Sequence, residues 1–311
     1  MLLSGHALAA GSYGYSDENE IIGMTRRHRV EPEETLYQIA RKYNLGFNEV
    51  EDANPDLLDP MDPGIDKTVL LPTRWVLPSG REGADIVVNL AEMRIYRFYS
   101  SLDRKLVSSY PIGVGMDGFT TPLGSFNVTE RFYRPTWFVP DSIRKEQPEL
   151  PESVPPGPEN PLGEYALKLS ESSYFIHGTN KPFGIGMRVS HGCIRLYPED
   201  IAELYSIVGK GARVEVVYEP VKAGVRDRRV YLEVHKDYLG RVDDMQALAD
   251  GVLSSRGLLE TADKGLVRRA VEEKLGIPVP VGSLEAGVAE HAGAMEKKSP
   301  PEPGAPGGVP N

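Results

Sequence analysis

Short apolar runs separated by turn residues dominate residues 84–219. Runs of about four to eight residues that are rich in Val, Ile, Tyr and Phe are typical of strands. The predicted strands lie in DIVVNL, MRIYRFY, KLVSSYPIGVG, TPLGSFNVTERF, YALKLS, YFIHG, CIRL and ARVEVVYEP. A helix is predicted in PEDIAELYSIVG, with Pro198 in its first turn and Gly209 at its end. Many short strands with few helices predict a mainly β fold with some α, with this domain built as a β-sandwich.

Residues 27–77 follow a different pattern. Apolar positions recur on one helical face in TLYQIARKYNL, where Thr35 and Gln38 form a capping box. A second short helix is predicted in FNEVEDAN and stops before Pro55. With HRV before the helices and KTVLLP after them, the order is strand, helix, helix, strand. This order predicts a small α+β (β-α-α-β) module.

Residues 131–163 contain too many prolines for a continuous strand. Loops of this length are usually functional or disordered. The segment carries four aromatic residues whose exposure to water would be costly: Phe132, Tyr133, Trp137 and Phe138. We therefore expect it to fold back on the domain as a lid.

The two ends of the chain carry weaker patterns. Residues 1–26 are interpreted as the remnant of an export signal, from the Ala7-Leu8-Ala9 pattern, followed by a flexible N-terminus. Residues 220–281 predict a strand, in VYLEVHKDY, and a helical extension. Residues 282–311 are rich in Pro, Gly, Glu and Ala and predict a disordered tail.

Composition restricts the class of protein. A length of 311 residues, 40% of them hydrophobic, fits two or three domains with real cores. The net charge of −10 argues against a nucleic-acid partner, because a phosphate backbone is bound by clustered Lys and Arg. No stretch approaches the roughly 18 apolar residues of a membrane span.

Cys193 is the only cysteine, so it cannot form an intramolecular disulfide and stays a free thiol even in an oxidising compartment. A nucleophilic cysteine needs a base, a group that orients the base, and backbone N–H donors for the oxyanion. His191 would share a face with Cys193 in an extended strand. His177 follows an apolar strand and precedes Gly178, which lets the backbone turn. Proximity favours His191 as the base, and His177 is the alternative.

The surroundings of the thiol suggest further roles. Gly192 allows close approach of a substrate and directs its N–H, with that of Cys193, toward a developing oxyanion. Pairing with an imidazolium would lower the thiol pKa from about 8.5 into the physiological range. Two alternatives stay open: a cysteine packed as a small core residue beside structural histidines, and a zinc site formed by His177, His191 and Cys193.

The stretch IHGTNKPFGIGMRVSHGCIRLYPED, preceded by PIGVG and TPLGSFNV, resembles the signature of the YkuD-type L,D-transpeptidases. The likeness spans most of residues 84–219. It implies that Cys193 is the nucleophile, that His177 donates and accepts the proton in place of His191, and that the Gly178 carbonyl orients His177. It assigns the pocket and oxyanion site to Ser190, His191, Gly192 and Arg195.

Residues 27–77 resemble a LysM domain in VEPEETLYQIARKYNL, DANP and VLLP, with Glu33-Glu34 at a turn where Gly-Asp is usual. LysM domains bind glycans that contain N-acetylglucosamine. In an exported bacterial protein, the resemblance implies binding to peptidoglycan.

Together the two resemblances imply an exported L,D-transpeptidase of the periplasm or cell wall, acting in peptidoglycan biosynthesis and cell shape. The acyl donor is a tetrapeptide stem, cleaved between the L centre of a diamino acid and the terminal D-Ala. The acceptor amine belongs to another stem or to an envelope lipoprotein, and Tyr133 and Trp137 are candidate lid contacts with the donor. No metal or organic cofactor is needed. The alternatives are transfer to water, as an L,D-carboxypeptidase or hydrolase, and a wall-binding protein with little activity.

Overall fold

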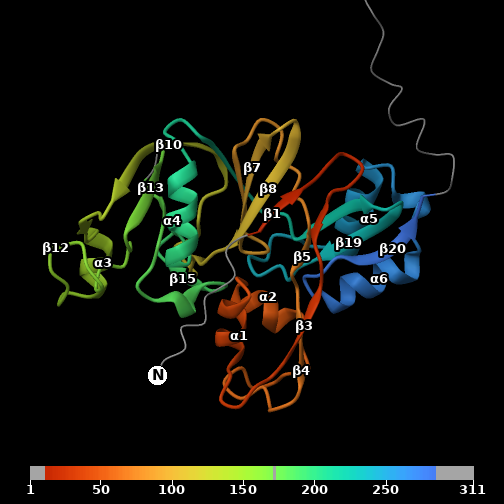
Figure 1. The fold of residues 1–311 in the computed structure, drawn as a ribbon, viewed down its shortest axis with the longest axis horizontal. Helices are drawn as coiled ribbons and strands as arrows, with labels where there is room; N and C mark the ends of the chain where they lie inside the picture. Colours follow the sequence, from red (N-terminus) through yellow and green to blue (C-terminus); the bar gives the residue numbers. More distant parts are fainter. Residues whose placement is uncertain (1–10, 171–172, 285–311) are drawn as a thin grey trace, which may run out of the picture.

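The computed structural model describes residues 11–170 and 173–284 (Figure 1). Its largest element is a nine-stranded sheet with the order β1-β8-β7-β6-β17-β10-β13-β14-β16. In that order the strands are Ser12–Gly14, Arg104–Pro111, Arg94–Ser101, Ile86–Asn89, Arg213–Val217, Gly124–Tyr133, Tyr165–Leu169, Phe175–His177 and Ile194–Arg195. The mainly β fold predicted from the sequence is confirmed.

The sheet curls so that its two halves share one apolar core. Ile86, Val88 and Ile95 from β6 and β7 pack in the same cluster as Leu167 and Ile176 from β13 and β14. Helix α4 (Pro198–Ile207), the helix predicted from PEDIAELYSIVG, closes this core with its buried apolar face. The two packed β layers of the predicted β-sandwich are thus formed by the two halves of one continuous sheet.

The other face of the sheet is covered by residues 26–71. Strands β3 (Arg26–Arg29) and β4 (Thr68–Leu71) pair antiparallel, and helices α1 (Leu36–Lys42) and α2 (Phe47–Asp52) lie between them in the chain. The predicted order of strand, helix, helix and strand is therefore confirmed, with the capping box at Thr35 and Gln38 in place. Apolar residues of this module form a second core with Val87, Phe98 and Val107 of the sheet.

A buried ion pair joins the module to the sheet. Glu49 of α2 accepts hydrogen bonds from Nη1 of Arg94 at 2.7 and 2.8 Å, and from the indole N–H of Trp75 at 2.9 Å. The Arg94 guanidinium also lies 4.1 Å from the centroid of the Trp75 ring, which belongs to β5 (Arg74–Val76). The two charges are hidden from water together, so neither is left unpaired.

The module also contacts the loop that leads toward Cys193. The backbone N–H of Phe47 donates to the carbonyl of Ile185 at 3.0 Å. The next residue in that loop, Gly186, has a φ of +81°, and a Cβ there would strike the backbone of Phe47. The approach of the two backbones therefore requires glycine at position 186.

Residues 221–283 form a third unit with its own core. Strands β18 (Val221–Arg226), β19 (Arg229–Val234) and β20 (Val279–Ser283) make an antiparallel sheet that carries helices α5 (Met245–Ser255) and α6 (Lys264–Glu273). The helical extension is confirmed, while two of the three strands were not predicted.

A second set of buried charges fastens this unit to the rest of the protein. The ammonium of Lys222 donates to Glu92 at 2.7 Å and to the carbonyl of Val76 at 2.7 Å, and it lies 3.0 Å from a carboxylate oxygen of Glu233. Burial opposes the charge of Lys222, but Glu233 and Glu92 raise its pKa on balance. One cation therefore links β5, the turn after β6 and the third unit.

Two predictions at the chain ends need correction. A flexible N-terminus up to residue 26 is wrong for its described part, because β1 pairs with the otherwise open edge of β8, and β2 (Ile21–Gly23) pairs with β5. The predicted tail beginning at 282 is wrong at its first residues, since β20 runs to Ser283. Residues 1–10, with the proposed export signal, and 285–311 lie outside the described residues. Within the described ranges, no helix has the length and apolar character needed to cross a membrane.

Lys222→Ala is expected to lower the free energy of unfolding by about 3–5 kcal/mol, because it leaves the carboxylates of Glu92 and Glu233 buried without their cation. Urea denaturation followed by circular dichroism measures the loss. Arg269→Ala, which removes an exposed i,i+4 pair with Glu273, is the control and should have little effect. An unchanged unfolding midpoint for Lys222→Ala would contradict the proposed fastening role.

Candidate active site

His177 and Cys193 come from neighbouring parallel strands at the end of the curled sheet. In the pairing of β14 with β16, Ile176 lies opposite Ile194, and His177 lies opposite Arg195. Both isoleucines are fully buried in the core. Side chains alternate between the faces of a strand, so His177, Cys193 and Arg195 share the face that points away from the core. The pairing of the two strands thus places the imidazole and the thiol on one face of the sheet.

The backbone fixes the tautomer of His177. Its Nδ1 lies 2.6 Å from the carbonyl oxygen of Gly178, which can only accept, so Nδ1 carries the proton and Nε2 is left as the base. Burial and, less strongly, the charge of Arg195 lower the pKa of His177 to about 3, while hydrogen bonds to the backbone of Gly178 and Leu162 oppose this. The resting imidazole is therefore neutral.

The thiol is neutral as well. Burial raises the pKa of Cys193, and a backbone hydrogen bond from Phe175 and the charge of Arg195 oppose it only in part. The expectation that an imidazolium lowers this pKa into the physiological range is therefore wrong for the resting site. A nucleophilic role for Cys193 would therefore require a base to remove the proton of the thiol.

A tight turn presents the thiol. The hydroxyl of Ser190, at the end of β15 (Arg188–Ser190), donates to the carbonyl of Cys193 at 2.6 Å and accepts from the N–H of Gly192 at 3.2 Å. Gly192 has a φ of +97°, and a Cβ there would fall on the ring of Tyr174. The N–H of Gly192, expected to face an oxyanion, is used within the turn instead. Tyr174 is a site residue that the sequence gave no reason to select.

His191 faces away from the base position. Its Nε2 lies 3.2 Å from a carboxylate oxygen of Glu146, and its ring lies 4.4 Å from that of Phe119. Proximity in sequence favoured His191, but the turn at Gly192 breaks the extended geometry on which that argument rested. A zinc site formed by His177, His191 and Cys193 is not among the groups that the described residues assemble.

Glu146 belongs to residues 131–163, the predicted lid. Helix α3 (Asp141–Glu146) lies between two short strands, β11 (Trp137–Phe138) and β12 (Ser153–Val154), that pair with each other. The segment reaches the site through its Glu146 contact with His191. The expectation that the aromatic side chains of this segment avoid water is wrong for two of them, since Tyr133 is 61% and Phe138 is 76% exposed. A role of Tyr133 and Trp137 as contacts with a substrate stays a prediction.

Arg195 has an unused donor beside the thiol. Its backbone exchanges two hydrogen bonds of 2.9 Å with Gly113. Its side-chain Nε is buried and has no hydrogen-bond partner among the described residues. A buried donor without an acceptor is costly, so this geometry favours a bound group that carries an oxygen.

Among the described residues, one group has the geometry to hold a metal ion: Glu92, Glu233 and His235. Lys222 already places its ammonium between the two carboxylates. This cluster is thus an internal ion network.

The sequence and these residues match known proteins. The family model described as L,D-transpeptidase catalytic domain matches residues 83–216. The probable L,D-transpeptidase YcfS of Escherichia coli (strain K12) is 36% identical over 278 residues, which cover 85% of each chain. The probable L,D-transpeptidase ErfK/SrfK of Salmonella typhimurium is 35% identical over 304 residues, covering 93% of this chain and 96% of that protein.

The chain belongs to the L,D-transpeptidase family.

Among solved structures, this transpeptidase is similar to the catalytic domain of the E. faecium L,D-transpeptidase, with 24% identity and a TM-score of 0.34. The match covers 44% of this chain and 99% of that one. The family assignment made from IHGTN and SHGCIR is thus confirmed, and the protein is an L,D-transpeptidase. The LysM assignment of residues 27–77 stays a prediction.

Gly192→Ala is expected to lower kcat/KM of this transpeptidase by about a hundredfold or more, because the Cβ displaces the turn that presents Cys193. Adding Tyr174→Ala should restore part of the activity, since it removes the ring but not the strain of a positive φ. Gly209→Ala, where a Cβ meets nothing within 4 Å, is the control and should retain activity. Equal activity of Gly192→Ala and Gly209→Ala would refute this account of the turn.

His177→Gln is expected to flatten the pH dependence of stability. In the wild type the pKa of His177 is about 3 when folded and about 6.5 when unfolded, so stability is present above pH 6.5 and is lost as the pH falls toward 3. Within this window the loss amounts to about 1.4 kcal/mol per pH unit. Thermal unfolding from pH 7 to pH 4 compares the two proteins. Parallel curves would show that His177 is not held neutral by the fold.

Proposed function

We propose that this enzyme transfers peptidoglycan stem peptides through a thioester on Cys193, with a tetrapeptide stem as acyl donor and an amine as acceptor. One observation carries the proposal: His177 and Cys193 share a face of paired strands, and the Gly178 carbonyl holds His177 with Nε2 unprotonated. This is the arrangement that a thiol needs to lose its proton during attack.

The chemistry proceeds in two steps. The sulfur of Cys193 attacks the carbonyl carbon at the L centre of the donor's diamino acid while its proton passes to Nε2 of His177. The bond from that carbon to the nitrogen of D-Ala breaks, and the D-Ala amine takes the proton. An acceptor amine then attacks the thioester, gives a proton to His177, and forms a new amide as the thiol is restored.

Arg195 and Cys193 stabilise the charge that develops in each step. The N–H of Cys193 takes the oxyanion role, since the N–H of Gly192 is bonded to Ser190. The unpaired Nε of Arg195 lies on the same face and offers a charged hydrogen bond to an oxygen of the donor.

The lid favours an amine over water as the acceptor. Helix α3 reaches His191 through Glu146, next to the turn that presents Cys193. A thioester persists when water is excluded until the amine arrives. The acceptor amine belongs to a second stem or to a lysine of an envelope lipoprotein.

The enzyme works in the periplasm or cell wall on this proposal, because its donor lies there. Residues 27–77 would bind the glycan, which raises the concentration of stems around Cys193. Support for this role comes from the LysM-like sequence and from the rigid attachment of the module to the catalytic sheet.

Incubation of the purified protein with a defined disaccharide tetrapeptide, followed by mass spectrometry, tests the proposal. We expect a cross-linked product and an acylated protein for the wild type, and neither for Cys193→Ala. His177→Ala should lose at least about a hundredfold in rate. His191→Ala should retain most of the rate, because His191 faces Glu146.

Each other outcome has a defined meaning. A tripeptide without cross-link would identify water as the acceptor and contradict amine transfer. Loss of activity in His191→Ala but not in His177→Ala would overturn the assignment of the base. No product at all, with the protein still bound to sacculi, would indicate a wall-binding protein.

A further inference from the structure

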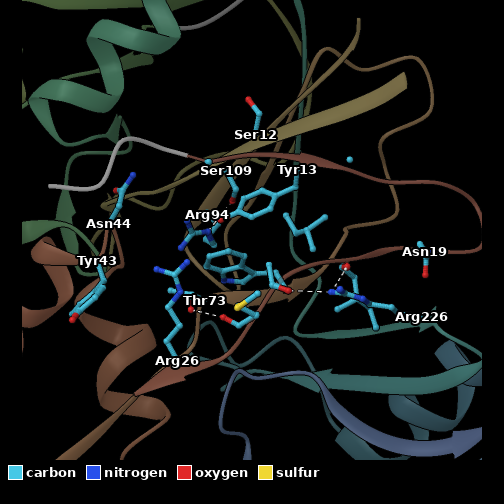
Figure 2. Close-up of a pocket in the computed structure, with 17 residues that line it drawn as sticks. Ser12, Tyr13, Asn19, Arg26, Tyr43, Asn44, Thr73, Arg94, Ser109 and Arg226 are labelled. Atoms are coloured by element: carbon cyan, nitrogen blue, oxygen red, sulfur yellow. Dashed lines mark hydrogen bonds between the residues drawn. The ribbon is translucent and has the colours of Figure 1, made fainter. Parts of the chain in front are cut away.

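A cavity of about 530 Å³ opens where three parts of the protein meet (Figure 2). Its walls come from β1 and β2, from the chain after α1, and from β5, β7 and β8. Strands β1 and β16 are the two edges of the large sheet, so this cavity and Cys193 belong to opposite ends of the strand order. The cavity takes no part in the chemistry described above.

Three arginines line the cavity, and two of them pair with carboxylates outside the lining: Arg94 with Glu49 at 2.7 Å and Arg226 with Asp227 at 3.6 Å. Arg26, Arg94 and Arg226 surround the cavity, and none of the described residues that line it is Asp or Glu (Figure 2). This is notable in a chain of net charge −10 with 45 acidic residues. Such a concentration of one charge in a concave site attracts anions.

Arg94 brings a buried donor to the cavity. The residue is 1% exposed; its Nη1 is bonded to Glu49 and its Nε donates to the hydroxyl of Ser109 at 2.9 Å. Glu49, Ser109 and the Trp75 ring therefore hold the Arg94 guanidinium in the wall of the cavity.

Arg226 and Arg26 line other walls of the cavity. Nη1 of Arg226 is held by the carbonyls of Ile21 at 3.3 Å and Gly23 at 3.0 Å. Arg26 is exposed and forms no ion pair with a described residue. Of the three arginines, Arg26 is thus the one without a carboxylate partner among the described residues, which suits a ligand that carries a carboxylate.

Aromatic rings complete the lining. Trp75 and Tyr13 meet edge to face with ring centroids 6.3 Å apart, and Tyr43 lines the side formed by the module. Rings of this kind pack against the aliphatic parts of a ligand while the arginines bind its charges. The volume is within the usual range for small-molecule sites.

We propose that this cavity is a second binding site, which holds the carboxylates of a peptidoglycan stem peptide away from the catalytic thiol. The inference rests on the proposed function for the choice of ligand. A neutral glycan would leave the charge of Arg26 unused, whereas a stem peptide presents several carboxylates on a short chain. Binding there keeps the enzyme on the wall between turnovers and raises the local concentration of donors.

Fluorescence gives a direct test, because the chain has two tryptophans, Trp75 in the cavity and Trp137 in the lid. In the full chain with Cys193→Ala and Trp137→Phe, Trp75 is the sole tryptophan, and excitation that avoids tyrosine reports on it alone. Titration with the free tetrapeptide stem should change its emission, and the apparent Kd should rise with salt. A tetramer of N-acetylglucosamine should cause no change.

Arg26→Glu and Arg27→Glu form a matched pair in that background. Both residues are exposed and lie in β3, but only Arg26 lines the cavity. We expect Arg26→Glu to weaken binding about tenfold or more, and Arg27→Glu to leave it within about twofold. Equal effects of the two substitutions, an unchanged Trp75 signal, or equal binding of the neutral tetramer would each overturn the proposal.

Turnover separates this inference from the proposed function. With Cys193 intact, the Arg26→Glu variant should form the acyl-enzyme from a soluble donor at the wild-type rate. It should lose only the stem binding that the Trp75 emission reports. If the wild type forms no acyl-enzyme while Trp75 still reports stem binding, the proposed chemistry fails and the second site stands.

Discussion

Strand β6 has to be buried on both faces, and the other parts of the molecule are arranged around that requirement. Ile86 and Val88 point into the core shared with β13, β14 and α4, while Val87, between them, packs under the LysM-like module. A strand with this pattern reads as a continuous apolar run and needs a cover on each side. One cover carries His177 and Cys193, and the other carries the module. The candidate site and the module thus lie on the two sides of one strand.

Buried charges then make this placement specific. Glu49 with Arg94, and Lys222 with Glu92 and Glu233, each join residues from different units and leave no member unpaired. Apolar surfaces can slide against one another at small cost, whereas an ion pair removed from water fits in one relative position. The candidate catalytic groups differ from these pairs. Burial lowers the pKa of His177 and raises that of Cys193, which favours the neutral form of each.

The sequence predicted most of the fold, and the resemblance named His177 and Cys193, whose catalytic roles stay predictions. Strand periodicity, the capping box at Thr35 and the helix after Pro198 depend on neighbouring residues, so local patterns contain them. The role of Gly178 also followed from the resemblance. Proximity alone favoured His191 as the base, because the positive φ of Gly192 is not visible in a spacing of two residues. Tyr174 and Glu146 were missed since tertiary folding alone brings them to the turn. The strands at residues 12–14 and 279–283 were missed because short edge strands carry little periodicity.

The hydrogen bond between Phe47 and Ile185 bears on how such proteins can be rearranged. A module on a flexible linker can be exchanged between genes or removed by truncation with its neighbour intact. Here a cut before residue 84 would strip one face of β6, leave Arg94 buried without Glu49, and remove the backbone contact beside Gly186. Residues 26–71 and the transpeptidase domain are thus one packed unit, and each constrains which substitutions the other can accept.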